Sequence, residues 1–212
     1  MKSITIKGIS KSFKNQVVLK PLSISFESGK IYGIAGRNGS GKSVFLKLIT
    51  GLMKPDTGEI RIDEKVLGKD IDFPISCGAI IDSPEFFNEY SGIKNLEILA
   101  NIKKKIGKKE IEHYFSVFGL NDKLKTVRKY SLGMKQRLAL AQAFMESPEF
   151  IILDEFSNGL DKHGVEFVRK YIKDYSNNET IIILTSHYDE DLSILCDEVY
   201  KIEDGEVSKY DV

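Results

Sequence analysis

The sequence predicts an α/β fold: a mixed β-sheet flanked by helices, with an antiparallel β edge subdomain and an inserted helical subdomain. Three observations predict it. The short apolar runs IYGIA, GAIID, FIILD and TIIIL are typical of parallel strands buried on both faces. The first strands instead alternate polar and apolar residues around a turn at Ser28 and Gly29, which is typical of an antiparallel edge sheet. Between GAIID and FIILD lie about sixty residues without a strong strand pattern, which is too long for a simple crossover.

Each element follows from its local pattern. Helices are expected over residues 41–50, 92–104, 108–118, 133–146, 162–175 and 189–195. We interpret residues 1–212 as a single domain, in which 1–82 and 149–212 form the sheet core and 83–148 form the inserted helical subdomain. The expected strands, in order, are SITIKGI, LSISF, KIYGIAG, GEIRI, GAIID, FIILD, TIIILT and EVYKI.

The composition limits the possible partners and location. Lys+Arg and Asp+Glu both number 31 among 212 residues, so the net charge is zero and no nucleic-acid partner is expected. No apolar run reaches the roughly 18 residues of a membrane span. The opening MKSITIKGIS lacks the apolar stretch of a secretion signal. Cys77 and Cys196 match no metal-binding spacing, so we expect reduced thiols near the core of a cytoplasmic protein.

A phosphate-binding loop follows the strand KIYGIAG. Residues 36–43 fit the pattern G-x-x-x-x-G-K-[ST] between a strand and a helix, which predicts a P-loop NTPase (RecA-like) fold that binds a nucleoside triphosphate. Glycines let backbone N–H groups turn towards an anion, and the helix that follows adds the positive end of its dipole. This pattern alone does not distinguish a kinase, a GTPase, a helicase and a transporter ATPase. The expected nucleotide-binding residues here are Gly36, Arg37, Asn38, Gly39, Ser40, Gly41, Lys42, Ser43 and Val44.

Two adjacent carboxylates end the apolar strand FIILD. Because a parallel strand delivers its last side chains to the edge of the sheet where the phosphate loop opens, Asp154 is expected to bind Mg²⁺ together with the Ser43 hydroxyl. Glu155 points differently and is placed to polarise the attacking water, a contribution of typically ~10²–10⁴-fold in rate. Residues 1–82 and 149–212 are therefore expected to form a nucleotide-binding core.

Further motifs resemble those of the ATP-binding cassette (ABC) ATPases, in the same order along nearly the whole chain. The run YSLGMKQR, residues 130–137, is similar to the family signature LSGGQ with its following basic residue, glutamine and arginine. The run SNGLD, residues 157–161, resembles the D-loop, and TSH, residues 185–187, resembles the switch-histidine loop. Phe13 occupies the place of the aromatic residue that stacks on adenine.

This resemblance implies a composite site. Ser131 and Gly133 would bind the γ-phosphate of an ATP held by the opposite subunit, so a homodimer or heterodimer of ATPase subunits would enclose two ATPs. His187 would donate to the γ-phosphate from the end of the strand TIIILT. Asp161 would line the subunit interface, although it also suits an ordinary helix N-cap.

The chain departs from the family pattern at several positions. Asp82 stands where the family has a glutamine that contacts Mg²⁺ and the water, so direct metal contact by Asp82 is expected with a shorter reach. Phe156 replaces the proline after the catalytic glutamate, and Leu132 replaces a glycine of the signature. With the YSLGMKQR form of the signature, Asp82 makes the chain resemble the subgroup that exports antibiotic peptides and bacteriocins.

The resemblance implies the ATP-hydrolysing motor subunit of an ABC transporter, peripheral on the cytoplasmic face of the cell membrane and driving a separate transmembrane permease subunit. Phe86, Phe87 and Tyr90 would receive that partner, or else would belong to the core of the helical subdomain. A soluble ABC ATPase acting on the ribosome or DNA is the alternative, but such proteins usually carry two cassettes or a coiled-coil insertion. A small-molecule kinase would leave the signature and switch-histidine runs unexplained.

Overall fold

The computed structural model describes residues 2–14, 16–74 and 76–211. Helix ends agree with the expected ones to within two residues. The helices are α1 (Lys42–Ile49), α2 (Gly92–Lys103), α3 (Lys108–Val117), α4 (Leu132–Phe144), α5 (Lys162–Tyr175) and α6 (Asp189–Leu195), with a 3-10 turn at Val127–Lys129. The strands are β1 (Ser3–Phe13), β2 (Gln16–Glu27), β3 (Lys30–Ala35), β4 (Thr57–Ile62), β5 (Lys65–Val66), β6 (Cys77–Ile80), β7 (Phe150–Leu153), β8 (Ile181–Thr185), β9 (Glu198–Glu203) and β10 (Glu206–Lys209).

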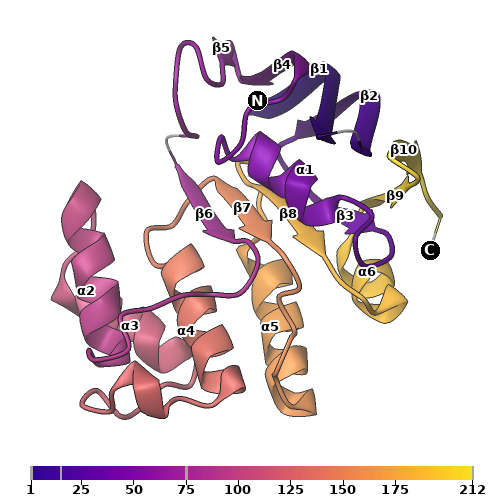
Figure 1. The fold of residues 1–212 in the computed structure, drawn as a ribbon. Helices are drawn as coiled ribbons and strands as arrows, with labels where there is room; N and C mark the ends of the chain where they lie inside the picture. The colour runs from indigo at the N-terminus through magenta and orange to yellow at the C-terminus, as the bar shows by residue number, and fades with distance from the viewer. Residues whose placement is uncertain (1, 15, 75, 212) are drawn as a thin grey trace.

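The main sheet has six strands in the order β10-β9-β3-β8-β7-β6. Strands β9, β3, β8, β7 and β6 are parallel, and β10 pairs antiparallel with β9. A second, antiparallel sheet has the order β2-β1-β4-β5 and lies above the main sheet in Figure 1. The expected α/β fold with a mixed sheet and an antiparallel edge subdomain is therefore confirmed.

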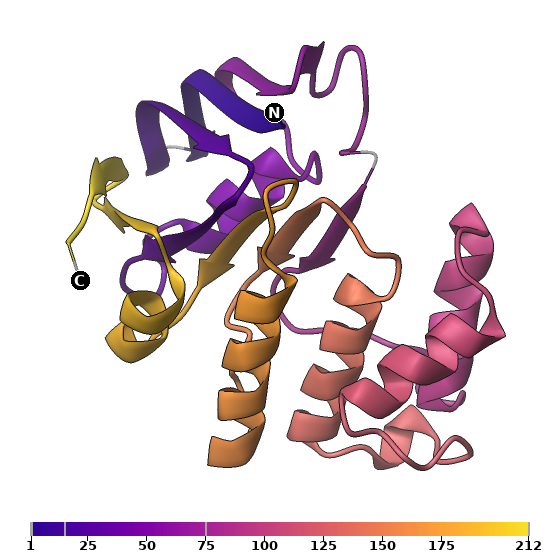
Figure 2. The ribbon, with the colours of Figure 1, turned by 180° about the vertical axis from the view of Figure 1, so that it is seen from behind.

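Two hydrophobic cores lie on opposite faces of the main sheet. Phe150 and Ile152 of β7 face the first core, together with α1 and the antiparallel sheet. Ile151 and Leu153 face the second core, together with helices α2 to α6. This alternation explains why the strand sequences are apolar throughout: both faces of the sheet are covered. Figure 2 shows α4 and α5 running side by side along the second face.

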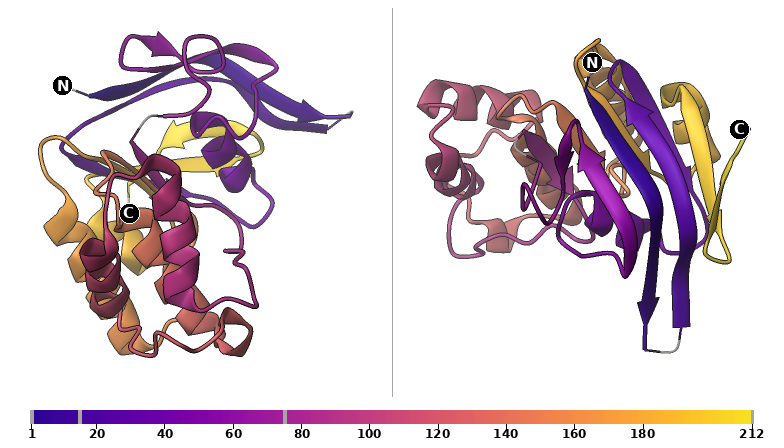
Figure 3. Two further views of the ribbon diagram at one scale, coloured as in Figure 1. Left: turned by 90° about the vertical axis from the view of Figure 1, so that its left-hand side faces the viewer. Right: turned by 90° about the horizontal axis from the view of Figure 1, so that it is seen from above.

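The inserted segment connects two adjacent strands of the main sheet, β6 and β7. Helices α2 and α3 project to one side, away from the antiparallel sheet, as Figure 3 shows from above. Helix α4 packs against both α3 and β6, so it joins the projecting helices to the sheet. Ser91 begins α2 and Ser131 begins α4, each accepting a hydrogen bond from the backbone three residues on. No helix in the described ranges is long and apolar enough to cross a membrane.

An ion-pair cluster fastens the C-terminal hairpin to β3. The Glu198 carboxylate at the start of β9 accepts hydrogen bonds from Lys30 Nζ at 2.7 Å and Lys209 Nζ at 3.2 Å. The hydrogen bond from Lys30, aided by the one from Lys209, lowers the pKa of Glu198 from 4.5 to about 2. Glu198 therefore contributes stability to the sheet above pH 4.5, where the carboxylate is ionised in the folded and unfolded chain alike.

Candidate nucleotide-binding site

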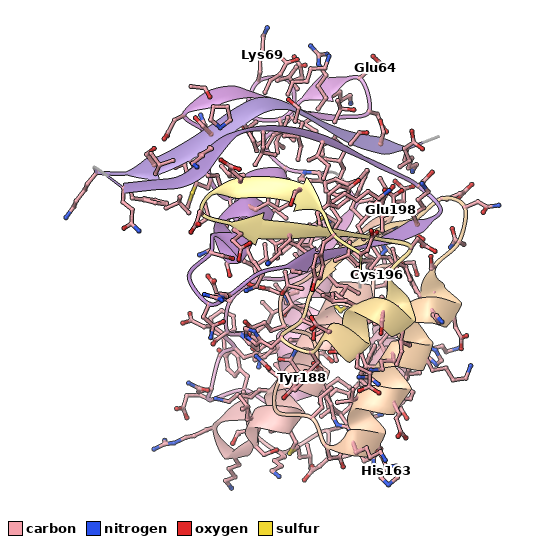
Figure 4. All side chains as sticks on the ribbon, turned by 90° about the vertical axis from the view of Figure 1, so that its right-hand side faces the viewer. Glu64, Lys69, His163, Tyr188, Cys196 and Glu198 are labelled. Carbon is pink, nitrogen blue, oxygen red and sulfur yellow. The ribbon has the colours of Figure 1, made fainter. Side chains whose placement is uncertain are left out.

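Four loops meet at the carboxyl ends of adjacent parallel strands. The phosphate loop follows β3, His187 follows β8, Asp154 and Glu155 follow β7, and Asp82 follows β6. The register pairs Ile34 with Thr185, Leu153 with Leu184 and Ile80 with Leu153, so these strands end at the same edge. In Figure 4, Tyr188 marks the loop after His187, below β9 and β10 and well away from Glu64 and Lys69 on the antiparallel sheet.

The phosphate loop turns sharply out of β3. Gly36 has a φ of 149°, and a Cβ at this position would lie 2.6 Å from the carbonyl oxygen of Ile202. Only glycine fits this turn without displacing the backbone of β9. Helix α1 begins directly after the loop, so the N–H groups of its first turn are free of intrahelical partners and face the site.

Lys42 places a buried cation inside this loop. Its side chain is only 5% exposed, and Nζ donates to the carbonyl oxygens of Gly36 at 2.8 Å and Arg37 at 3.1 Å. Within the described ranges, no carboxylate pairs with Lys42, and the buried Ser40 hydroxyl has no hydrogen-bond partner. A buried charge held only by carbonyl dipoles is costly, so an anion such as a nucleotide phosphate suits this cradle.

Oxygen ligands suited to Mg²⁺ converge beside the loop. Ser43 Oγ donates to Asp154 Oδ2 at 2.7 Å, and Thr185 Oγ1 donates to Asp154 Oδ1 at 2.6 Å. A hydroxyl and a carboxylate at this distance match the hard oxygen donors that Mg²⁺ takes, with phosphate oxygens and water completing its shell. No group of three or more His, Cys, Asp or Glu side chains gathers around a metal position in the part of the chain that is described.

Glu155 is held in an unusual backbone conformation. Its φ is 51°, in the left-handed region, which costs a non-glycine residue about 1 to 3 kcal/mol. Its amide donates to Thr185 Oγ1 at 2.9 Å, and Oε1 lies 2.5 Å from His187 Nε2. Asn158 Nδ2 also donates to the Glu155 carboxylate. The structure thus brings Glu155 and His187, expected from separate loops, into direct contact.

Two clefts border these residues. The lining of one, of about 560 Å³, includes Ser43, Asp82, Asp154, Glu155, Leu132 and Gly159. A second, of about 500 Å³, lies on the other side of the phosphate loop. Its lining includes Gln16, Val17, Val18, Arg37, Asn38, Gly39, Ser40 and residues 202–205.

The Asp82 side chain points to a lysine instead of towards Asp154. Asp82 Oδ2 lies 2.5 Å from Lys47 Nζ on α1, and the side chain is half exposed. The backbone amide of Asp82 donates to Asp154 Oδ2 at 3.5 Å. Direct metal contact by the Asp82 carboxylate stays a prediction, because it requires the side chain to leave Lys47.

The signature run begins helix α4 and packs on the loop at residues 157–161. Ser131 Oγ accepts a hydrogen bond from the Met134 amide at 3.2 Å, and a Cβ on Gly133 would lie 2.6 Å from the carbonyl oxygen of Gly159. Among the described residues that line the two clefts, Leu132 is present but Ser131 and Gly133 are not. Their assignment to a γ-phosphate held by another subunit stays a prediction.

Asp161 and Phe13 are two further residues that the sequence predicts at the site. Asp161 caps α5, accepting from the Gly164 amide at 2.9 Å, and it also contacts Arg137 at 3.4 Å. The N-cap interpretation is thus observed, and an interface role stays a prediction. Phe13 is 44% exposed at the end of β1, opposite Gln16 in the strand register. Gln16 lines the second cleft. Adenine stacking by Phe13 also stays a prediction.

Two residues that organise the site, Thr185 and Gln136, lie in motifs recognised from the sequence, but sequence reasoning gave neither a role. Thr185 joins Asp154 to the backbone of Glu155, as described above. Gln136 is buried, and its Nε2 donates to the carbonyl oxygen of Phe156 at 2.9 Å, which ties α4 to the loop after β7. A threonine ending a fully apolar strand and a glutamine inside an apolar helix are the signals that could have identified them.

Comparison with known proteins places these features in a family. The sequence profile of the family described as "ABC transporter" matches residues 19–158. The uncharacterized ABC transporter ATP-binding protein YybJ of Bacillus subtilis (strain 168) is 41% identical over 203 residues, covering 95% of this chain and 93% of YybJ. The bacitracin transport ATP-binding protein BcrA of Enterococcus faecalis is 35% identical, covering 95% of this chain and 67% of BcrA.

Solved structures show the same fold. A structure described as the ATP-binding subunit of an ABC transporter superposes with a TM-score of 0.87 at 25% identity, covering 99% of this chain and 90% of that one. The ATP-binding cassette MJ0796, solved as a dimer bound to ADP and Pi after hydrolysis, gives a TM-score of 0.86 at 20% identity over 99% of each chain. The lantibiotic transport ATP-binding protein SrtF of Streptococcus pyogenes is a further relative, 29% identical over 96% of this chain and 88% of SrtF.

Proposed function

This chain belongs to the ABC transporter family of ATPases, and from that premise we propose that it is the Mg²⁺-dependent motor subunit of a peptide-antibiotic exporter. In this proposal two ATPase subunits enclose two ATPs and drive a separate transmembrane permease subunit. The observation that carries it is the convergence of three features at one sheet edge: the buried Lys42, the Ser43–Asp154 contact, and the Glu155–His187 pair.

Each of these residues would have a separate role in ATP hydrolysis. Lys42 and the amides of the phosphate loop bind the phosphates of ATP, and Ser43 and Asp154 would hold Mg²⁺, which compensates charge on the phosphate oxygens. Glu155 accepts a hydrogen bond from the attacking water and orients it. His187, which contacts Glu155 in this structure, would donate a hydrogen bond to the γ-phosphate.

In this proposal a second subunit is needed because Ser131 and Gly133, unlike Leu132, are not among the described residues that line the clefts of their own chain. Ser131 and Gly133 lie at the start of α4, where amides and a hydroxyl favour an anion. MJ0796, which has the same fold, was solved as a dimer bound to ADP and Pi, and this supports a dimeric arrangement of the ATPase subunits.

The transporter role is supported by the relatives and by an exposed aromatic pair. BcrA and SrtF are transport proteins for bacitracin and a lantibiotic, which favours export of such peptides. Phe87 and Tyr90 are 59% and 49% exposed, with ring centroids 5.9 Å apart, whereas Phe86 packs against the second core. We assign Phe87 and Tyr90 to contact with the permease subunit, which would hold the chain on the cytoplasmic face of the membrane.

The test is a resistance assay in cells. A strain that lacks this gene should become more sensitive to bacitracin or lantibiotics, and the wild-type gene should restore resistance. Glu155→Gln, which keeps the shape of the site, should not restore it. Equal sensitivity of the deletion and wild-type strains to all peptides tried would contradict the exporter assignment, while ATP hydrolysis by the purified chain would still be tested separately.

A further inference from the structure

A buried carboxylate lies behind the catalytic loops. Asp191, in the first turn of α6, has no exposed surface, and Arg169 of α5 pairs with it. Arg169 Nε donates to Asp191 Oδ1 at 2.7 Å, and the terminal Nη2 lies 2.6 Å from the same oxygen. Burying a charge is costly unless it is paired, so this carboxylate needs Arg169 in order to be accommodated.

The second carboxylate oxygen of Asp191, Oδ2, accepts hydrogen bonds from both catalytic loops. Ser157 Oγ donates to Asp191 Oδ2 at 3.1 Å, and Ser186 Oγ donates to the same Oδ2 at 2.5 Å. Ser157 is two residues beyond Glu155, and Ser186 directly precedes His187. The Tyr188 amide also donates to Ser186 Oγ, at 3.0 Å, so the backbone on both sides of His187 is tied to this point.

We propose that Asp191 is a positioning residue for ATP hydrolysis: it sets the distance between Glu155 and His187 by holding both of their loops on one oxygen. Glu155 sits in a left-handed conformation that persists only where its surroundings enforce it. The Ser157 hydrogen bond is one of the constraints that fix the chain immediately after Glu155. Asp191 itself touches neither Glu155 nor His187 in any described contact.

The two carboxylate oxygens of Asp191 have different partners, and this distinguishes the positioning role from simple stabilisation of the fold. Oδ1 and Arg169 attach α6 to α5, which supports the fold. Oδ2 bonds only to Ser157 and Ser186 among its described partners, and both belong to the catalytic loops. The attachment of the helices and the placement of the loops can therefore be disturbed independently.

The inference rests on the ATPase activity of the chain, and its test uses Ser157→Ala and Ser186→Ala. Each variant removes the hydrogen bond between one loop and Asp191 Oδ2 but retains the Arg169–Asp191 pair. We expect kcat to fall roughly tenfold in each, because small misplacements of catalytic groups cost that much or more. The affinity for ATP, measured by equilibrium titration, and the thermal unfolding midpoint should stay near the wild-type values.

Two further variants sharpen the outcome. Arg169 Nη2 also donates to Glu190 Oε2 at 3.0 Å. Glu190→Gln weakens this contact and leaves both loops bonded to Asp191, so kcat should be unchanged. The double variant Ser157→Ala/Ser186→Ala should lose no more than the worse single variant, because cutting either link already frees the two loops from each other.

The outcomes separate this inference from the assignment of ATPase activity. If the wild-type chain binds ATP but never hydrolyses it, alone or with its membrane partner, the proposed motor function fails. If the wild type hydrolyses ATP and the serine variants keep its kcat, the positioning role of Asp191 is overturned. A fall in kcat that follows a matching fall in unfolding midpoint, or that also appears in Glu190→Gln, would overturn it as well.

Discussion

Lys47 and Asp82 form an ion pair, with Nζ 2.5 Å from Oδ2, between helix α1 and the loop after β6. The sequence predicts direct contact between Asp82 and the Mg²⁺ that Asp154 is expected to bind. In the structure each of the three carboxylates has its own partner, since Asp154 accepts from hydroxyls and Glu155 contacts a histidine. The Asp82 carboxylate is thus held by a lysine and not by the partners of the other two acids.

Substitutions at Asp82 should therefore act through Mg²⁺ dependence. Asp82→Gln restores the length of the family's residue, and Asp82→Asn removes the charge only. We expect both variants to bind ATP and Asp82→Gln to keep or raise hydrolysis, because neither change alters Ser43 or Asp154. ATPase rates measured across a Mg²⁺ titration will check this.

Lys47→Met is the matched variant for this pair. Releasing the Asp82 carboxylate from its lysine should lower the Mg²⁺ concentration needed for half-maximal rate, if the freed side chain reaches the metal. The same lysine change in an Asp82→Asn background should have a smaller effect. Unchanged Mg²⁺ dependence in all of these variants would show that Asp82 is only a loop residue.

Lys42→Ala should abolish most nucleotide affinity. Removing the buried cation leaves the phosphates without their charged partner, a change that typically costs about 3 to 5 kcal/mol, or more than roughly 10²-fold in Kd. Isothermal titration with ATP provides the measurement, and Lys65→Ala on the exposed strand β5 is the control. Equal affinity in both variants would refute the assignment of the phosphate loop.

Glu155→Gln should accumulate an ATP-bound dimer. The glutamine keeps the shape of the site but cannot act as a base, so the bound ATP that holds two subunits together is not consumed. Light scattering should show the mass doubling when ATP is added and returning when ATP is removed. Absence of any ATP-dependent change in mass would count against a shared site.

Glu198→Gln should weaken the fold in a pH-dependent way. Because the pKa of Glu198 is lowered from 4.5 to about 2, its ionised form stabilises the folded chain above pH 4.5, and that stability is lost as the pH falls towards 2. At pH 7 the variant should lose about 1 to 2 kcal/mol of unfolding free energy, allowing for partial solvent screening.

Urea denaturation at pH 7 and at lower pH values checks this expectation. The difference between wild type and Glu198→Gln should shrink as the pH drops below 4.5. Glu206→Gln, which loses only an exposed contact with Lys20, serves as the control and should show a smaller effect. A difference that stays constant with pH would mean that the charge of Glu198 is not what stabilises the hairpin.

Both cysteines should resist thiol reagents in the folded chain. Burial raises the pKa of Cys77 and of Cys196 to about 12, so almost no thiolate exists near neutral pH. Reaction with a disulfide reagent at pH 8 should be slow, and complete once the chain is unfolded in denaturant. Rapid labelling of either thiol in the native protein would contradict the raised pKa of that partly buried thiol.

The sequence predicted the fold well where strands or helices carry an unambiguous period. It missed β5 and β10, which are short and expose most of their side chains, so neither has an apolar pattern to recognise. Strand β10 exists because its backbone pairs with β9, a partner that local sequence does not specify.

The candidate site divides in a similar way. Contiguous motifs indicated the phosphate loop and the acid pair, because those residues act within a few positions of one another. Contacts between distant segments were not visible: Lys47 with Asp82, and Asp191 with Arg169 and the two serines. Such pairings depend on how strands are ordered in the sheet, and that order brings together residues far apart in the chain.

The order of strands in the main sheet also governs how the chain can be made. Strand β3 pairs with β8 and β9, which are synthesised on the order of 10 s later on a ribosome. Until then its apolar residues have neither of their neighbours, and both of its backbone edges are open to pairing with other chains. Nascent chains of this protein therefore pass most of their synthesis with the strand that leads into the phosphate loop unprotected. Chains released before residue 181 should aggregate instead of folding, and they should be the ones that chaperones retain.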